Sequence, residues 1–332
     1  MAIVQSIFFN FLAFLLSIIV TAVPYAGFKA PVIKTLSDDC LLNVEMLSDT
    51  HLEEKELFRQ GFLKLALKNF SRAKSPVDAV LVAGDITNYG DEPTLAKYFD
   101  IIEKYSPAPV ITAAGNHDIG HVGDRDVTNI TREEALANFI RYRNGNTGRN
   151  DTVNYYSTEI NGFKFIILGD EVIDGGHWDD ISMSPEQLQF LDRELADGTK
   201  DGKPVFVCSH WPIKGINGEQ TIWAGSGVDP EDYDIQSILE KYKNVFYISG
   251  HMHAGIKAKA IEKWYGLSNA EQVNGVTYLN LPTFGIINMF GTPWSGTGAQ
   301  LEVYENEVVF RPRNLLTNKW FVNAEYHFDI VK

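Results

Sequence analysis

Five short segments of the chain carry side chains of the types that bind metal ions. In chain order they are Asp49-Thr50-His51, Gly84-Asp85, Gly115-Asn116-His117-Asp118, His210 and Gly250-His251-Met252-His253. They contain five of the eight histidines and no cysteine. Imidazole, carboxylate and amide oxygen are ligands that zinc, manganese and iron share, so a thiolate zinc site is not expected. The set predicts a hydrolytic site for two metal ions.

Two ions held ~3.5 to 4 Å apart would do the chemistry that hydrolysis of a phosphoester requires. A hydroxide between them attacks phosphorus in line, and the pair neutralises the charge on the phosphoryl oxygens. Such a pair needs a carboxylate that bridges it. Asp85, on a tight turn after Gly84, is the candidate bridge.

Each segment follows a short apolar run that predicts a buried strand. The runs are residues 41–47, 79–83, 110–114, 204–209 and 245–249. Helices are expected at residues 53–74, 92–105 and 184–196, the last with Ser184 as N-cap, Pro185 in the first turn and Gln187 in capping-box position. Alternating strands and helices indicate an α/β sheet, whose ligand sites lie at the carboxyl ends of its strands. We therefore expect all five segments to converge on one edge.

Further strands predict a second sheet. Residues 153–160 and 163–168 are joined by Asn161-Gly162, a strong hairpin signal. Residues 276–281, 300–304, 307–311 and 324–330 also have strand patterns. We expect a second, largely antiparallel sheet, with a catalytic domain over residues 36–285 and strands in residues 286–332 that complete the second sheet.

Composition and charge limit the class of protein. The 332 residues are 45% hydrophobic and 12% aromatic, which fits a globular chain with a large core. The formal charge is 29 minus 43, or −14, so the general surface repels a long nucleic acid. A small phosphoester attracted by local metal charge is the expected partner. Two cysteines, Cys40 and Cys208, imply no disulfide framework.

The first 23 residues contain no charged side chain and are mostly apolar from residue 7 to residue 20. This pattern, followed by Val20-Thr21-Ala22, predicts a secretory signal peptide or an uncleaved N-terminal membrane anchor. A buried N-terminal helix is the third interpretation of this segment. The expected location is secreted or extracytoplasmic, with the membrane contacted only through this segment.

Taken singly, an Asp-x-His or a Gly-Asp is common in turns and caps. Together the five segments resemble the signature of the calcineurin-like metallophosphoesterases at every position: Asp-x-His, Gly-Asp, Gly-Asn-His-Asp/Glu, His and Gly-His-x-His. The resemblance extends from about residue 41 to residue 280. It implies an α/β fold, the four-layer α/β/β/α sandwich of two mixed sheets, and hydrolysis of phosphoesters.

The resemblance also implies a role for each residue. Asp49, His51 and His253 would hold one ion, and Asn116, His210 and His251 the other, with Asp85 between them. His117 would protonate the leaving oxygen, and Asp118 would help to set the tautomer and orientation of His117. The ions would be manganese, iron (Fe²⁺ or Fe³⁺) or zinc, since sites of this kind accept several first-row metals.

Within the superfamily, residues 47–52 and 84–88 resemble the class III cyclic-nucleotide phosphodiesterases most. A small phosphodiester, such as a cyclic nucleotide, is therefore the favoured substrate. Asn88 stands where many of those relatives carry Asp, and where purple acid phosphatases carry their iron-binding tyrosine, so no tyrosinate-coloured site is expected. A phosphomonoesterase remains an alternative, as do a nuclease, which the charge disfavours, and a catalytically silent scaffold.

Other residues are candidates for contacts with the substrate. His121 and Arg125 follow the Gly115–Asp118 segment in a predicted loop. Residues 211–232 form either a lid or a passive loop. Trp211, Trp223, Trp264 and Trp294 are candidates for stacking on a nucleobase.

Overall fold

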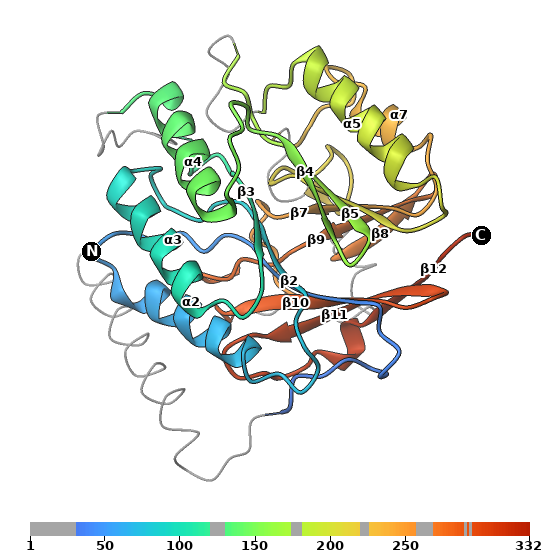
Figure 1. Ribbon diagram of the computed structural model, residues 1–332, viewed down its shortest axis with the longest axis horizontal. Helices are drawn as coiled ribbons and strands as arrows, with labels where there is room; N and C mark the ends of the chain where they lie inside the picture. The colour runs from blue at the N-terminus through green and yellow to red at the C-terminus, as the bar shows by residue number, and fades with distance from the viewer. Residues whose placement is uncertain are drawn as a thin grey trace.

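Two six-stranded sheets pack face to face at the centre of the molecule (Figure 1). The computed structural model describes residues 31–119, 130–173, 181–219, 226–256, 268–288, 291 and 294–332. Both sheets are mixed, because each has a parallel part and antiparallel additions at its edges. The expected four-layer α/β/β/α architecture is confirmed.

The first sheet has the strand order β12-β11-β10-β1-β2-β3. Its strands are β1 (Leu42–Leu47), β2 (Ala79–Ala83), β3 (Val110–Ala113), β10 (Thr297–Val303), β11 (Glu307–Asn314) and β12 (Tyr326–Asp329). Strands β1, β2 and β3 are parallel, whereas β10 runs antiparallel to β1 with Val44 opposite Leu301. Three of the five segments that carry candidate metal ligands therefore follow strands of this sheet.

The second sheet has the order β4-β5-β6-β7-β9-β8. Its strands are β4 (Tyr156–Ile160), β5 (Phe163–Ile167), β6 (Val205–Cys208), β7 (Val245–Ser249), β8 (Ala270–Val273) and β9 (Val276–Asn280). The hairpin β4–β5 turns at Asn161 (φ 51°) and Gly162 (φ 77°), as expected for that dipeptide. The other two segments that carry candidate metal ligands follow strands β6 and β7.

Helices cover the outer faces of the two sheets (Figure 1). Helices α2 (Leu57–Phe70), α3 (Glu92–Tyr105) and α4 (Arg132–Thr147) lie on one side, and α5 (Pro185–Gly198) and α7 (Ile235–Leu239) on the other. A short 3-10 helix, η2, spans Val322–Ala324. Helix α2 is shorter than expected because the Glu56 carboxylate accepts hydrogen bonds from the first backbone amides and caps it there.

The expected grouping of the strands was wrong in two respects. The C-terminal strands β10, β11 and β12 do not complete a second sheet, because β10 pairs with β1 and so covers the open edge of the parallel strands. The five segments also converge from two sheets instead of one. Apolar runs predict where strands form, but they do not say which strands pair.

The predicted leader, residues 1–23, lies outside the described residues. Among the helices that are described, none has the length and apolarity needed to cross a bilayer.

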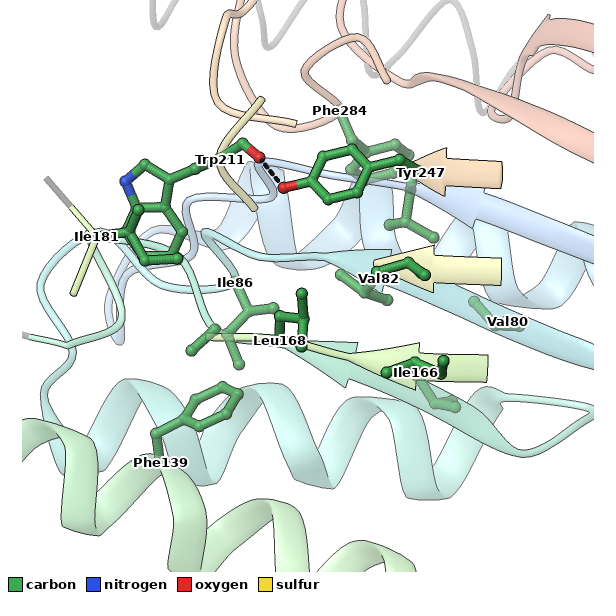
Figure 2. Packing of buried hydrophobic residues seen from close by; sticks show 14 of the residues in the cluster. Val80, Val82, Ile86, Phe139, Ile166, Leu168, Ile181, Trp211, Tyr247 and Phe284 are labelled. Atoms are coloured by element: carbon green, nitrogen blue, oxygen red, sulfur yellow. Dashed lines mark hydrogen bonds between the residues drawn. The ribbon is translucent and has the colours of Figure 1, made fainter. Parts of the chain in front are cut away.

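Aromatic and aliphatic side chains fill the space beneath the ends of the strands (Figure 2). Trp211, three residues after the end of β6, is completely buried, and its backbone carbonyl accepts a hydrogen bond of 2.8 Å from the Tyr247 hydroxyl. Its indole meets the His210 ring edge to face, with centroids 5.4 Å apart. Trp211 is thus part of the core that supports His210. It is not a surface for stacking.

Because Trp211 is enclosed, Trp211→Ala should destabilise the protein by about 3 to 5 kcal/mol. Urea unfolding of the metal-free protein measures this loss. Trp294, which is 58% exposed, provides the matched control, and Trp294→Ala should change stability by less than about 0.5 kcal/mol. Equal losses for the two variants would contradict the packing described here.

Candidate dinuclear metal centre

Nitrogen and oxygen atoms from the five segments meet at the carboxyl ends of β1, β2, β3, β6 and β7. The Asp85 carboxylate is at the middle of the group. Its Oδ2 lies 3.7 Å from Nε2 of His51 and 3.2 Å from Nε2 of His210. Its Oδ1 accepts a hydrogen bond of 3.0 Å from the backbone amide of His117. Asp85 therefore faces groups from three other strands.

On one side of Asp85, three residues form a first set of donors. The Nε2 atoms of His51 and His253 are 3.1 Å apart, and Nε2 of His253 is 3.1 Å from Oδ1 of Asp49. Ligand atoms of Asp49, His51, Asp85 and His253 all lie within 4.8 Å of one another. This spacing matches a site in which several side chains share one cation.

On the other side, His210 and His251 form a second set. Nδ1 of His251 is 3.2 Å from Nε2 of His210. The Nδ1–H of His210 points at the carbonyl of Ala83, at 2.7 Å, so Nε2 is the nitrogen that faces Asp85. A hydrogen bond of this kind fixes the tautomer of a metal-binding imidazole. Asn116, which is 2% exposed, follows Gly115 at the end of β3.

The backbone is constrained at most of these positions. Positive φ angles occur at five predicted ligands, namely Asp49 (56°), His51 (47°), Asp85 (50°), His251 (66°) and His253 (47°). Non-glycine residues rarely adopt this region, and such strain concentrates at functional sites. The turns are held by backbone hydrogen bonds between the loops, including Asp49 N to Gly84 O at 3.0 Å and His51 N to Asp85 O at 2.9 Å. The loops that carry the ligands therefore fix one another.

Two glycines of the segments are needed for close approach. Gly84 has φ of +84°, and a Cβ there would lie 2.6 Å from Nδ1 of His210. A Cβ on Gly115 would overlap Oδ1 of Asp85. Any larger residue would push these ligands apart, so the glycines are required by packing within the site.

Without a bound cation, burial of the carboxylates in this cluster costs free energy. Asp49 is completely buried, and no described residue donates a hydrogen bond to either of its carboxylate oxygens. A buried carboxylate without such donors carries a large desolvation penalty, which a bound metal ion offsets. The donor set of carboxylates, imidazoles and an amide therefore fits two metal ions, as the sequence predicts.

The pKa shifts agree with neutral imidazole ligands at two positions. Burial lowers the pKa of His51 and of His251 well below the usual value, so both rings are neutral and able to donate a lone pair. For His210, burial alone would lower the pKa, but the Asp85 carboxylate raises it to about 9. In the metal-free chain a proton on His210 thus offsets part of the carboxylate charge, at the place where a cation would do so.

The environment of His117 differs from the expected one. Its ring Nδ1 lies 2.9 Å from the backbone carbonyl of Asn88, and its ring meets that of His51 edge to face at 4.7 Å. Asp118 was expected to orient this imidazole, but its carboxylate accepts hydrogen bonds from the amides of Ile86, Thr87 and Gly115 and from the Thr87 hydroxyl.

The expectation for Asp118 was therefore wrong. Its carboxylate fixes the turn after Asp85, and a backbone carbonyl, which has no sequence signal, orients His117. Burial, together with the nearby Asp85 carboxylate, raises the pKa of Asp118 to about 7.

His121 and Arg125 lie outside the described residues, as do Trp223 and Trp264. The flanks of the segment 211–232, which was expected to be a lid or a passive loop, are part of the core, because Ile213 and Val228 are 1% and 0% exposed. Ser226, which had not been singled out, lies with its Oγ 3.2 Å from Nε2 of His251. A lone serine between glycines gave no signal of this contact.

Comparison with solved structures shows a similar fold in two phosphatases. A dimetal phosphatase from Danio rerio is 16% identical with a TM-score of 0.58, over 88% of this chain and 100% of that one. The purple acid phosphatase PPD1 from seeds of yellow lupin (Lupinus luteus) is also 16% identical with a TM-score of 0.58, over 90% of this chain and 55% of the lupin chain. At these identities the likeness concerns the fold alone.

No curated protein matches the sequence. The sequence does match the calcineurin-like phosphoesterase family over residues 44–255, which is more than half of its length and includes all five segments. With this match and a donor set that fits two ions, the chain is a metallophosphoesterase and belongs to the calcineurin-like phosphoesterase family.

Proposed function

We propose that the chain hydrolyses small phosphodiesters with two first-row metal ions, with cyclic nucleotides as the substrate class that its motifs favour. One observation supports the proposal above the others. The side chains of Asp49, His51, His210, His251 and His253 gather around Asp85, and no described residue donates a hydrogen bond to the buried carboxylate of Asp49. That arrangement is unfavourable unless cations are present.

We assign the ligands by the sides of Asp85 on which they lie. Asp49, His51 and His253 would hold one ion, because their donor atoms cluster together. His210 and His251, with Asn116, would hold the second ion. Asp85 would contact both, since its Oδ2 faces His51 and His210 at once. Manganese, iron and zinc all suit this mixture of nitrogen and oxygen donors.

When bound, a pair of such ions lowers the pKa of water and neutralises charge on phosphoryl oxygens. The protein supplies the remaining step through His117. Its Nδ1–H donates to the Asn88 carbonyl, so in the doubly protonated ring the Nε2–H is the group left to deliver a proton to the leaving oxygen. His117 is partly exposed, whereas the assigned ligands His51, His210 and His251 are buried, so a substrate can reach it.

The preference for diesters rests on the similarity of residues 47–52 and 84–88 to class III cyclic-nucleotide phosphodiesterases. A phosphomonoesterase would use the same residues. The silent scaffold predicts a missing ligand or a replaced His117, and all eight residues are present.

Asp85→Asn should lower metal occupancy on both sides of the residue, because the amide presents only one oxygen and no charge. Elemental analysis after loading with manganese should show a loss of at least about tenfold in affinity for both ions. Asp100→Asn, on the exposed face of α3, serves as the control and should retain both. Two tightly held ions in Asp85→Asn would show that another residue bridges them.

His117→Ala should keep its metal content and lose activity in a way that depends on the leaving group. Turnover of diphenyl phosphate, a poor substrate, should fall by about 10² to 10⁴. Turnover of bis-p-nitrophenyl phosphate should fall far less, since its leaving oxygen needs little protonation. His327→Ala, on the exposed part of β12, is the control. The same loss for both substrates would contradict the role of proton donor.

The diester preference is tested by comparing kcat/KM for bis-p-nitrophenyl phosphate and p-nitrophenyl phosphate with the same manganese-loaded preparation. We expect the diester to be the better substrate by at least about tenfold, or about 1.4 kcal/mol in the activation free energy. A better monoester would favour the phosphomonoesterase alternative.

A further inference from the structure

We propose that Glu53 is a positioning residue for His117, acting through the side chain of Asn88. This inference rests on the proposed function in one respect, namely that His117 delivers a proton to the leaving group. Glu53 follows the Asp49–His51 segment and precedes α2, and the assigned metal ligands do not include it.

Asn88 is held at two points in addition to its contact with His117. Its backbone amide donates to the carbonyl of Leu52 at 2.9 Å, and its side-chain Nδ2 donates to Oε1 of Glu53 at 2.9 Å. Its own carbonyl faces Nδ1 of His117 at 2.9 Å. The direction of that carbonyl depends on the orientation of residue 88, which the contacts with Leu52 and Glu53 hold together.

Glu53 is itself anchored to the ligand loop. Its Oε1 lies 3.6 Å from NH1 of Arg59, and the same NH1 donates a hydrogen bond to the carbonyl of His51. The side chain of Gln60 donates to the carbonyls of Glu53 and Glu54, each at 2.9 Å, and so holds the backbone of this turn. The acceptor of His117 is therefore tied to the same loop that carries His51.

The chemistry of the pair explains the residue types. Asn88 offers an amide donor to the Glu53 carboxylate, whereas an aspartate at position 88 would place two carboxylates against each other. Removal of the Glu53 carboxylate leaves the Asn88 amide without this acceptor and releases residue 88. The Nδ1–H of His117 then loses an aligned carbonyl, and Nε2 is no longer held toward the leaving oxygen.

The test compares three variants of the full-length, manganese-loaded chain. Glu53→Ala should lower turnover of diphenyl phosphate by about tenfold, the lower range for loss of an orienting partner, with little change for bis-p-nitrophenyl phosphate. Glu53→Gln keeps an oxygen acceptor for Asn88 and should restore most of the activity. Glu54→Ala, which removes an equal charge from an exposed neighbour, should behave as wild type.

The decisive comparison uses the His117→Ala background. There Glu53→Ala should have no further effect, because no imidazole remains to be positioned. An undiminished tenfold effect in that background, or an equal effect of Glu54→Ala, would overturn the proposal, since it would mean that Glu53 acts through charge or through the ligand loop.

A measurement that does not depend on catalysis separates this inference from the proposed function. In metal-free protein labelled with ¹⁵N-histidine, the signal lost in His117→Ala identifies His117, and it should show the Nδ1–H tautomer. In Glu53→Ala this tautomer should no longer dominate, and an unchanged tautomer would overturn the proposal. If His117→Ala affects both diesters equally, the proton-donor role fails, while this spectrum still decides whether Glu53 positions the ring.

Discussion

The burial of two carboxylates, Asp49 and Asp85, among imidazoles is the constraint on which the rest of the site depends. Asp85 is 1% exposed and Asp49 is fully buried, so their charge cannot be screened by solvent. The protein holds them with strained loops, with glycines that let the neighbouring rings approach, and with histidines of which two are neutral through burial. Positive charge supplied at this place offsets the cost of burying the two carboxylates, and the donor set fits metal ions that would supply it.

The architecture explains how these groups are kept in place. The strands that end at the site belong to two sheets, and the apolar side chains between the sheets pack them together; they include Phe165 and Phe206, which stack on each other within the second sheet. Trp211 packs beneath the strand ends, so His210, two residues after β6, is supported by the core. Movement of one sheet relative to the other would pull Asp49 and His51 away from His253, and Asp85 away from His210. The interface between the sheets thus stabilises the spacing of the donors.

Much of this arrangement could be predicted from local sequence. Apolar runs that end in a polar residue located all five strands of the site, and Asn161-Gly162 located a hairpin. Helix α4 and strand β8 were not expected, although Thr131 and Glu134 form a capping box and Asn274-Gly275 repeats the hairpin dipeptide. The partner of β1 could not be predicted, because the pairing of distant strands leaves no periodic signal. The acceptor of His117 is a backbone carbonyl, which every residue possesses.

The central claim is that this cluster holds two cations with Asp85 between them. It is tested most directly by the anomalous scattering of a crystal of the wild-type protein loaded with manganese. The account predicts two strong peaks, each within coordination distance of Asp85, one beside Asp49 and His253 and the other beside His210 and His251. A single peak, or peaks away from Asp85, would contradict it.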